Sequence, residues 1–146
     1  ASAVRDLNTV NYMRSFADSS TSGSTFFFDA SPVARTRFAA LFLAWSRELE
    51  QQYFENMKSR LPAGTAPSLT LALDQQSIGS DSVVVEATYQ LQVPHQLASV
   101  PQIARGKAQF ALIADRNRNW VIVRWVDLPN TQNDYTWSEL KGEFAQ

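Results

Sequence analysis

"ARGKAQFALIADRNRNWVIVRWVDL", residues 104–128, predicts two β-strands joined by a tight turn. The DRNRN segment at 115–119 is short and polar, so residues 105–114 and 119–127 are expected to pair as an antiparallel hairpin. Alternation along the second strand places Arg124 on one face and Asp127 on the other, which disfavours a direct ion pair between them. Arg124 is therefore expected to find a carboxylate on a neighbouring strand, and Asp127 to mark the strand end. A second interpretation has Arg124 reaching a cavity and gripping a carboxylate ligand.

Two further strands precede this hairpin. Residues 69–74 and 83–93 alternate between apolar and polar side chains, and the QQSIGSDS connection between them is short and turn-like. The four strands predict an antiparallel meander with one apolar and one wet face. The wet face is too polar for an obligate interface, which predicts a monomer or a weak homodimer. Its polar residues include Glu86, Thr88, Gln90 and Gln92.

Helical patterns occupy much of the remaining chain. Residues 4–17 predict a short amphipathic helix, and FFFD at 26–29 predicts a brief buried strand. A long helix is expected from Ser31 and Pro32, where serine can cap and proline fits the first turn, to about residue 60. TWSE at 136–139 has the spacing of a capping box, which predicts the start of a short last helix.

An aromatic stripe runs along the expected long helix. Its members recur at steps of three and four residues, which places them on one helix face. They are Phe38, Phe42, Trp45, Leu49, Tyr53 and Met57. The opposite face is expected to be solvated, and it carries Arg37, Arg47, Glu48, Glu50, Gln51, Glu55 and Lys58. The stripe has two interpretations: a packed core alone, or a core that also lines a ligand cavity.

Length and composition bound the class of protein. The 146 residues fit one domain, 1–146, and no linker or internal repeat divides it. The 13 basic and 14 acidic residues form no run of like charge, which disfavours nucleic acid as a partner. No apolar stretch is long enough for a membrane span, and the absence of cysteine excludes disulfides and thiolate chemistry. The Ala1-Ser2-Ala3 start suggests a mature exported protein or a trimmed chain.

The order of elements and several motifs resemble the NTF2-like (SnoaL-like) superfamily. The resemblance rests on NYMRSFADSS, FFFD, LFLAWSRELEQQYFENM, residues 104–128 and TWSELKGEF. Residues 104–128 contain Gly-x-x-x-Phe on one strand and Trp-x-Ile-x-x-Trp on the last strand. It implies an α+β cone, in which a curled antiparallel sheet of four or more strands wraps a long helix, with short helices at both ends. Within the superfamily the chain is most similar to uncharacterised bacterial proteins that are usually exported, often as lipoproteins. The leading helix is shorter than in the family's enzymes, which predicts either a wider mouth to the cone or a mouth completed by a segment that is missing from this sequence.

Candidate catalytic groups form no recognisable set. His95, the single histidine, follows Pro94 near a strand end and is expected to be structural or exposed, and no ligand cluster predicts a metal site. The strand-end carboxylates are expected to cap turns or form ion pairs; they are Asp29, Asp74, Asp115 and Asp127. The family also contains ketosteroid isomerase-like enzymes that use a cone aspartate as a proton shuttle. That alternative requires a buried Asp or His facing Tyr53 or Tyr89.

The sequence favours a non-catalytic, extracytoplasmic binding or assembly module over a small lyase or isomerase, and a cytoplasmic location stays open. Its partner is expected to be a small apolar ligand held in an aromatic-lined cone, or another protein bound at the surface. No cofactor, metal or catalytic residue is assigned. The expected ligand-binding residues are Trp45, Tyr53, Tyr89, Phe110 and Arg124.

Overall fold

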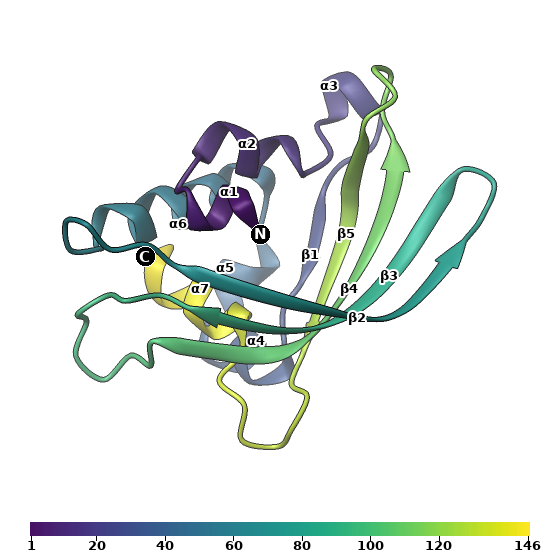
Figure 1. Cartoon of the computed structure of the whole chain (residues 1–146). Helices are drawn as coiled ribbons and strands as arrows, with labels where there is room; N and C mark the ends of the chain where they lie inside the picture. The colour runs from purple at the N-terminus through teal and green to yellow at the C-terminus, as the bar shows by residue number, and fades with distance from the viewer.

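The computed structural model describes all residues, 1–146, as a curled five-stranded sheet with short helices on its concave side (Figure 1). The sheet order is β1-β5-β4-β3-β2; β1 runs parallel to β5, and the other pairs are antiparallel. The strands are β1 (Phe27–Asp29), β2 (Ser68–Ile78), β3 (Ser82–Gln92), β4 (Ile103–Ala114) and β5 (Trp120–Leu128). The helices are α1 (Ser2–Arg5), α2 (Thr9–Arg14), α3 (Ser19–Ser22), α4 (Pro32–Arg37), α5 (Ala39–Leu43), α6 (Arg47–Ser59) and α7 (Trp137–Phe144).

The predicted meander is confirmed. β2 to β5 follow one another as antiparallel neighbours, and the expected brief strand at 26–29 becomes β1, which extends the sheet beside β5. The last helix is confirmed as well: the Thr136 side chain accepts from the Glu139 backbone while the Glu139 carboxylate accepts from the Thr136 backbone, a complete capping box.

The single long helix predicted from residue 31 to about 60 is wrong. The backbone leaves helical geometry at Phe38 (φ −126°, ψ 47°) and again between Ala44 and Ser46, which divides the segment into α4, α5 and α6. Ser46 restarts the helix, because its side chain accepts a hydrogen bond from the Leu49 backbone N–H. Phe42 of α5 and Trp45, which lies in the second break, both pack against Phe28 of β1. The longest helix, α6, therefore has 13 residues.

The N-terminal helix predicted over residues 4–17 is also interrupted. Leu7 has a positive φ of 53°, a conformation that a continuous helix does not allow, and it separates α1 from α2. Asn8 then caps α2 by accepting from the Asn11 backbone N–H. Two short helices thus lie where one was expected; α2 packs against α6, and α1 packs against α2 and β2 (Figure 1).

The core lies between the helices and the concave face of the sheet. Many of its side chains are aromatic and are stacked or packed edge to face, including Tyr12 on Phe54 (centroids 4.1 Å apart) and Trp125 on Trp137 (4.7 Å). No helix of the protein has both the length and the apolar character that a membrane crossing requires. The aromatic core fills the concave side of the sheet near α6 and α7. A ligand site on this side would have to lie on the part of the sheet that these two helices do not cover.

Candidate functional site

A buried ion pair lies inside the cone. Lys141 of α7 places its Nζ 2.8 Å and 2.9 Å from the two carboxylate oxygens of Glu50 of α6, and both side chains are fully buried. The Glu50 carboxylate also accepts from the Tyr12 hydroxyl (2.7 Å) and the Trp45 indole N–H (2.8 Å). Glu50 therefore lies in the core, and its predicted place on a solvated helix face is wrong. Three donors, from α2, α7 and the break before α6, satisfy its charge.

The Lys141 ammonium is enclosed by rings. Its Nζ lies 3.6 Å from the centroid of Phe28 and 3.4 Å from that of Trp125, within the range of cation–π attraction. Burial lowers the pKa of Lys141 to about 8, although the neighbouring Glu50 carboxylate works in the opposite direction. The cation thus occupies the volume in which an enclosed ligand would have to sit, so the cone is filled at this level.

A second buried polar group joins the sheet to the last helix. One Asp127 oxygen accepts from the Tyr89 hydroxyl (2.6 Å), and the other accepts from the backbone N–H (2.8 Å) and the hydroxyl of Ser138. Burial raises the pKa of Asp127 to about 6, against the lowering effect of these donors. Burial and the adjacent carboxylate also hold the pKa of Tyr89 far above its usual value.

The geometry around Asp127 meets one requirement of the enzyme alternative and fails another. A buried carboxylate with a raised pKa does face Tyr89, as a proton shuttle in the cone would need. However, Asp127 is fully buried, both of its oxygens already accept hydrogen bonds, and the Tyr89 hydroxyl donates to Asp127 rather than into open space. In this state Asp127 can fasten β5 to the start of α7, but it cannot reach a substrate.

The other sequence candidates have structural partners. Arg124 lies on the convex face, and its guanidinium contacts Asp29 of β1 at 2.7 Å, which confirms the expected ion pair with a neighbouring strand. His95 is buried, with Nδ1 accepting from the Leu97 N–H and Nε2 against the Pro101 carbonyl. Asp74 accepts from Thr88. Asp115 accepts two backbone N–H groups in its turn.

The predicted ligand-binding residues divide between the two sides of the sheet. Trp45, Tyr53 and Tyr89 are buried, and Tyr53 and Tyr89 both bond Trp137, through its indole and its backbone N–H respectively. Phe110 is half-buried and packs on Trp125 with centroids 5.3 Å apart. Arg124 stands apart from these four. Their role in binding a ligand stays a prediction, but only Phe110 has ring surface left to offer.

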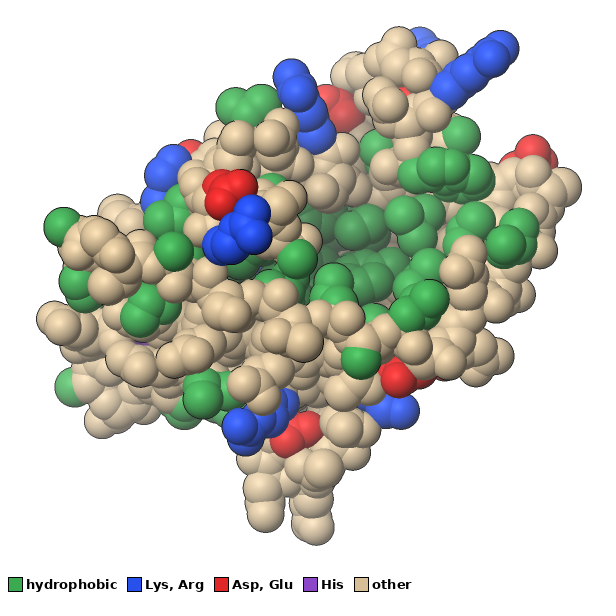
Figure 2. Space-filling view, in the orientation of Figure 1, with side chains coloured by type: hydrophobic (Ala, Val, Ile, Leu, Met, Phe, Trp, Pro, Cys, Tyr) green, Lys and Arg blue, Asp and Glu red, His purple; other side chains and the backbone are tan.

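A hollow lined by apolar side chains remains on the concave face, beyond the part that α6 and α7 cover (Figure 2). The strand register identifies its lining, because residues directly opposite on paired strands share a face. Tyr89 points inward, so Val85 and Val83 do too, together with their partners on β4 and β2. We call this surface the apolar mouth; it consists of Leu71, Leu73, Ile78, Val83, Val85, Phe110 and Leu112.

The apolar mouth is open to solvent. Leu71, Leu73 and Ile78 of β2 are 43%, 61% and 74% exposed, and the β3 and β4 members are half-buried. Contiguous exposed apolar surface is uncommon on a folded domain and often marks a binding site. Sequence reasoning expected a wide mouth but did not identify these aliphatic residues, although their alternation along 69–73 and 83–93 places them on the face of Tyr89.

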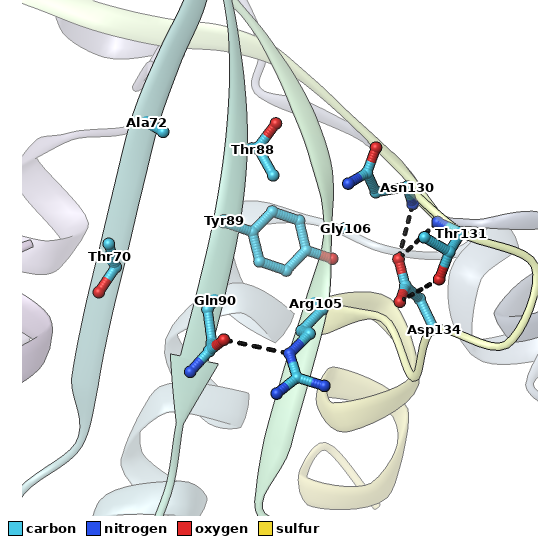
Figure 3. A pocket seen from close by; sticks show the side chains of 10 residues that line it. All are labelled: Thr70, Ala72, Thr88, Tyr89, Gln90, Arg105, Gly106, Asn130, Thr131 and Asp134. Atoms are coloured by element: carbon cyan, nitrogen blue, oxygen red, sulfur yellow. Dashed lines mark hydrogen bonds between the residues drawn. The ribbon is translucent and has the colours of Figure 1, made fainter.

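A separate polar cleft of about 400 Å³ lies beside the loop that follows β5 (Figure 3). Its polar groups are mostly occupied: the Asp134 carboxylate accepts from Asn130 and Thr131, and the Arg105 guanidinium donates to Gln90. Few donors or acceptors are left for a ligand, so the cleft is a weaker candidate than the apolar mouth. Its lining is Thr70, Ala72, Thr88, Tyr89, Gln90, Arg105, Gly106, Asn130, Thr131 and Asp134.

Comparison with known proteins identifies the fold. No family model matches the sequence, and no curated protein matches it. A conserved protein from Planctomyces limnophilus superposes with a TM-score of 0.65 at 12% identity, covering 87% of this chain and 84% of that one. A ketosteroid isomerase-like protein from Erwinia carotovora gives 0.57 at 8% identity, covering 89% and 87%. A designed NTF2-like protein gives 0.52 at 8% identity, covering 86% and 87%.

These likenesses show that the chain has the NTF2-like fold, as the sequence motifs implied. At such low identity they concern the fold alone, and this fold carries many unrelated activities. What the domain does must therefore be argued from its own surfaces.

Proposed function

We propose that this domain is a non-catalytic binding module that takes a small apolar ligand in the apolar mouth. One observation carries the proposal: a concave, exposed apolar surface adjoins a core in which the buried charged groups Glu50, Lys141 and Asp127 already have partners. A ligand seated there would cover the exposed leucine and isoleucine side chains of β2 and rest on the half-buried ring of Phe110. Removing this surface from water supplies the binding free energy.

The lining also indicates the kind of ligand. Every member of the apolar mouth is aliphatic or aromatic, and none brings a charge or a hydrogen-bond donor to the surface. Gln76 is the inward-facing polar neighbour, since it lies opposite Val85. The mouth therefore suits an uncharged ligand that is mostly hydrocarbon, such as a steroid-like or acyl compound, with its few polar atoms left in solvent.

Adjacent residues of one strand provide the test. Val85 faces the mouth, whereas Val84 faces the convex side of the sheet, and both are half-buried. Val85→Thr keeps the side-chain shape but adds a hydroxyl that a bound apolar ligand must desolvate, so we expect affinity to fall about fivefold or more. Val84→Thr makes the same change outside the mouth and should leave affinity unchanged.

The measurement is a titration with a neutral hydrophobic fluorophore and with steroid-like and fatty-acid ligands, followed by ligand fluorescence and by tryptophan quenching. Saturable binding that weakens in Val85→Thr and not in Val84→Thr supports the proposal. A wild-type protein that binds none of these probes, or equal weakening in both variants, would sink it. The proposal retains the extracytoplasmic location expected from the sequence, which fractionation of the native host would test.

A lyase or isomerase is the second candidate, favoured by the raised pKa of Asp127 and its contact with Tyr89. To act as a base, Asp127 would have to be released from Ser138, so α7 would have to move away from β5. The test is exchange of deuterium into the acidic α-carbon position of a ketone substrate. Exchange that is catalysed by the wild type and lost in Asp127→Asn would favour the enzyme over the binding module.

A further inference from the structure

The two edges of the sheet differ in how they are protected. β1, at one edge, has three residues, and a short edge strand offers little for another strand to pair with. β2, at the other edge, has 11 residues and pairs only with β3. The backbone groups on its free side make no hydrogen bond within the chain.

The first half of β2 lacks the usual devices that prevent edge pairing. Proteins protect exposed edges with lysines, prolines or bulges, or by covering them with a helix or loop. The short helix α1 contacts β2, but no backbone hydrogen bond joins α1 to the free side of the strand. Residues 68–73, SLTLAL, contain no charged residue and no proline, and the register stays regular until the irregularity between Leu73 and Gln75. Leucines at 69, 71 and 73 alternate with small polar or apolar residues, so the segment is a regular strand with one apolar face.

We propose that this edge pairs antiparallel with the same edge of a second copy of the chain, about a two-fold axis through Leu71. Residue numbers then sum to 142 across the interface. On the concave face, Leu71 meets Leu71 of the second copy, and Leu69 meets Leu73. On the convex face, Thr70 meets Ala72. Each Asp74 lies opposite Ser68, so the two carboxylates do not face each other.

This register pairs more apolar side chains across the interface than the registers shifted by one or three residues. It places all three leucines of each copy opposite leucines, and cross-strand apolar pairs stabilise a sheet. Shifting the axis by one residue toward Ala72 would put Leu69 opposite Gln75. Shifting it by three, to Asp74, would bring two like charges together. The paired segment 69–73 also ends before the irregularity at Asp74 in each copy.

The dimer would join two five-stranded sheets into one continuous sheet with both apolar mouths on the same side. Five paired residues from each copy make a small interface, so the association should be weak and concentration-dependent. That agrees with the polar convex face, which offers no second contact of the obligate kind. The same pairing would also cover part of the exposed surface of Leu71 and Leu73.

The absence of cysteine makes disulfide trapping a direct test. A single Leu71→Cys places two thiols opposite each other at the axis, and Thr70→Cys mixed with Ala72→Cys places two thiols opposite each other next to it. Opposed residues of an antiparallel pair alternate between hydrogen-bonded and non-hydrogen-bonded pairs, so one of these two adjacent positions is a non-hydrogen-bonded pair. A cross-strand disulfide fits at that position. Ile78→Cys, on the same strand and the same face, lies far from the axis and serves as the control.

Under mild oxidation, Leu71→Cys or the Thr70→Cys and Ala72→Cys mixture should form disulfide dimers at least about tenfold faster than Ile78→Cys, because opposed thiols are held together. Sedimentation of the wild type at millimolar concentration should show a dimer that Leu71→Lys removes while circular dichroism stays unchanged. Equal trapping rates at all positions, or a wild type that stays monomeric at that concentration, would overturn the inference. Neither result depends on ligand binding, so failure here is distinct from failure of the proposed function.

Discussion

Tyr89 and Val85 lie four residues apart on β3 and face the same side of the sheet, yet Tyr89 is fully enclosed and Val85 is half-buried. The difference arises from what lies above each residue. Near Tyr89, α7 brings Trp137, Ser138 and Lys141 onto the sheet, and the polar side-chain groups of these three residues all have partners. Near Val85, the strands continue beyond the helices, and the residues directly opposite Val85 are Phe110 of β4 and Gln76 of β2.

The comparison separates stability from function. The covered half holds charges that are stable only because they are paired, so a change there should be felt by the whole fold. The open half holds apolar side chains that contact little, so a change there should affect binding more than folding. The following experiments test this division, from the largest expected effect to the smallest.

The Glu50 and Lys141 pair should show the largest effect. Lys141→Met keeps the length of the side chain but leaves the Glu50 carboxylate buried beside only Tyr12 and Trp45, and the cost should be about 3–5 kcal/mol. Urea denaturation would measure it. The double variant Glu50→Gln/Lys141→Met removes both charges and should recover part of the loss. If the single variant unfolds at the wild-type urea concentration, the pair does not support the fold.

Asp127 should make stability depend on pH. Its pKa is raised in the folded protein to about 6, so the folded state binds the proton more tightly than the unfolded state does. This contribution to stability is fully present below the unfolded pKa, near 4, and is lost as pH rises through about 6. Between pH 4 and 7 the wild type should lose up to about 3 kcal/mol relative to Asp127→Asn. A difference between the two proteins that does not change with pH would contradict the assignment.

Gly106 should tolerate no side chain. A Cβ at this position of β4 would lie 2.5 Å from the Leu128 carbonyl oxygen and 2.6 Å from the Tyr89 hydroxyl, which would push Tyr89 away from Asp127. Gly106→Ala should cost about 1–3 kcal/mol in thermal or urea unfolding. Gly79→Ala, in the β2–β3 turn, has no contact under 3.4 Å and is the matched control. Similar losses in both variants would mean that the close packing at Gly106 is not the cause.

The apolar mouth should contribute least to stability. Leu73 is 61% exposed, so Leu73→Thr should change the free energy of unfolding by no more than about 0.5 kcal/mol. Met57→Ala on α6, where the side chain is fully buried, should cost about 2–5 kcal/mol. A large loss in Leu73→Thr would show that the open half is part of the core after all.

The sequence predicted the strands and the last helix correctly, but it did not predict which side chains these elements would bury against one another. The TWSE capping box and the alternating strands act through neighbouring residues, and both are present in the structure. The break before α6 could have been found, because Ser46 followed by two acidic residues in the next turn is a helix start. The burial of Glu50 also had a signal: Glu50, Tyr53, Phe54 and Met57 follow the i, i+3, i+4, i+7 pattern of a buried face.

The sequence by itself determined the class of fold, since strand alternation, turn residues and helix caps depend on side chains only a few positions apart. Only the tertiary structure decided that Lys141 would meet Glu50, 91 positions away, and that Tyr89 would meet Asp127. A buried charge is stable only when a partner from another element pairs with it, and the residues adjacent to it in the sequence do not indicate which residue that partner is. The apolar mouth was decided in the same way, because α7 begins against Tyr89 and runs toward His95, which leaves Val85 uncovered whatever residues lie beside it.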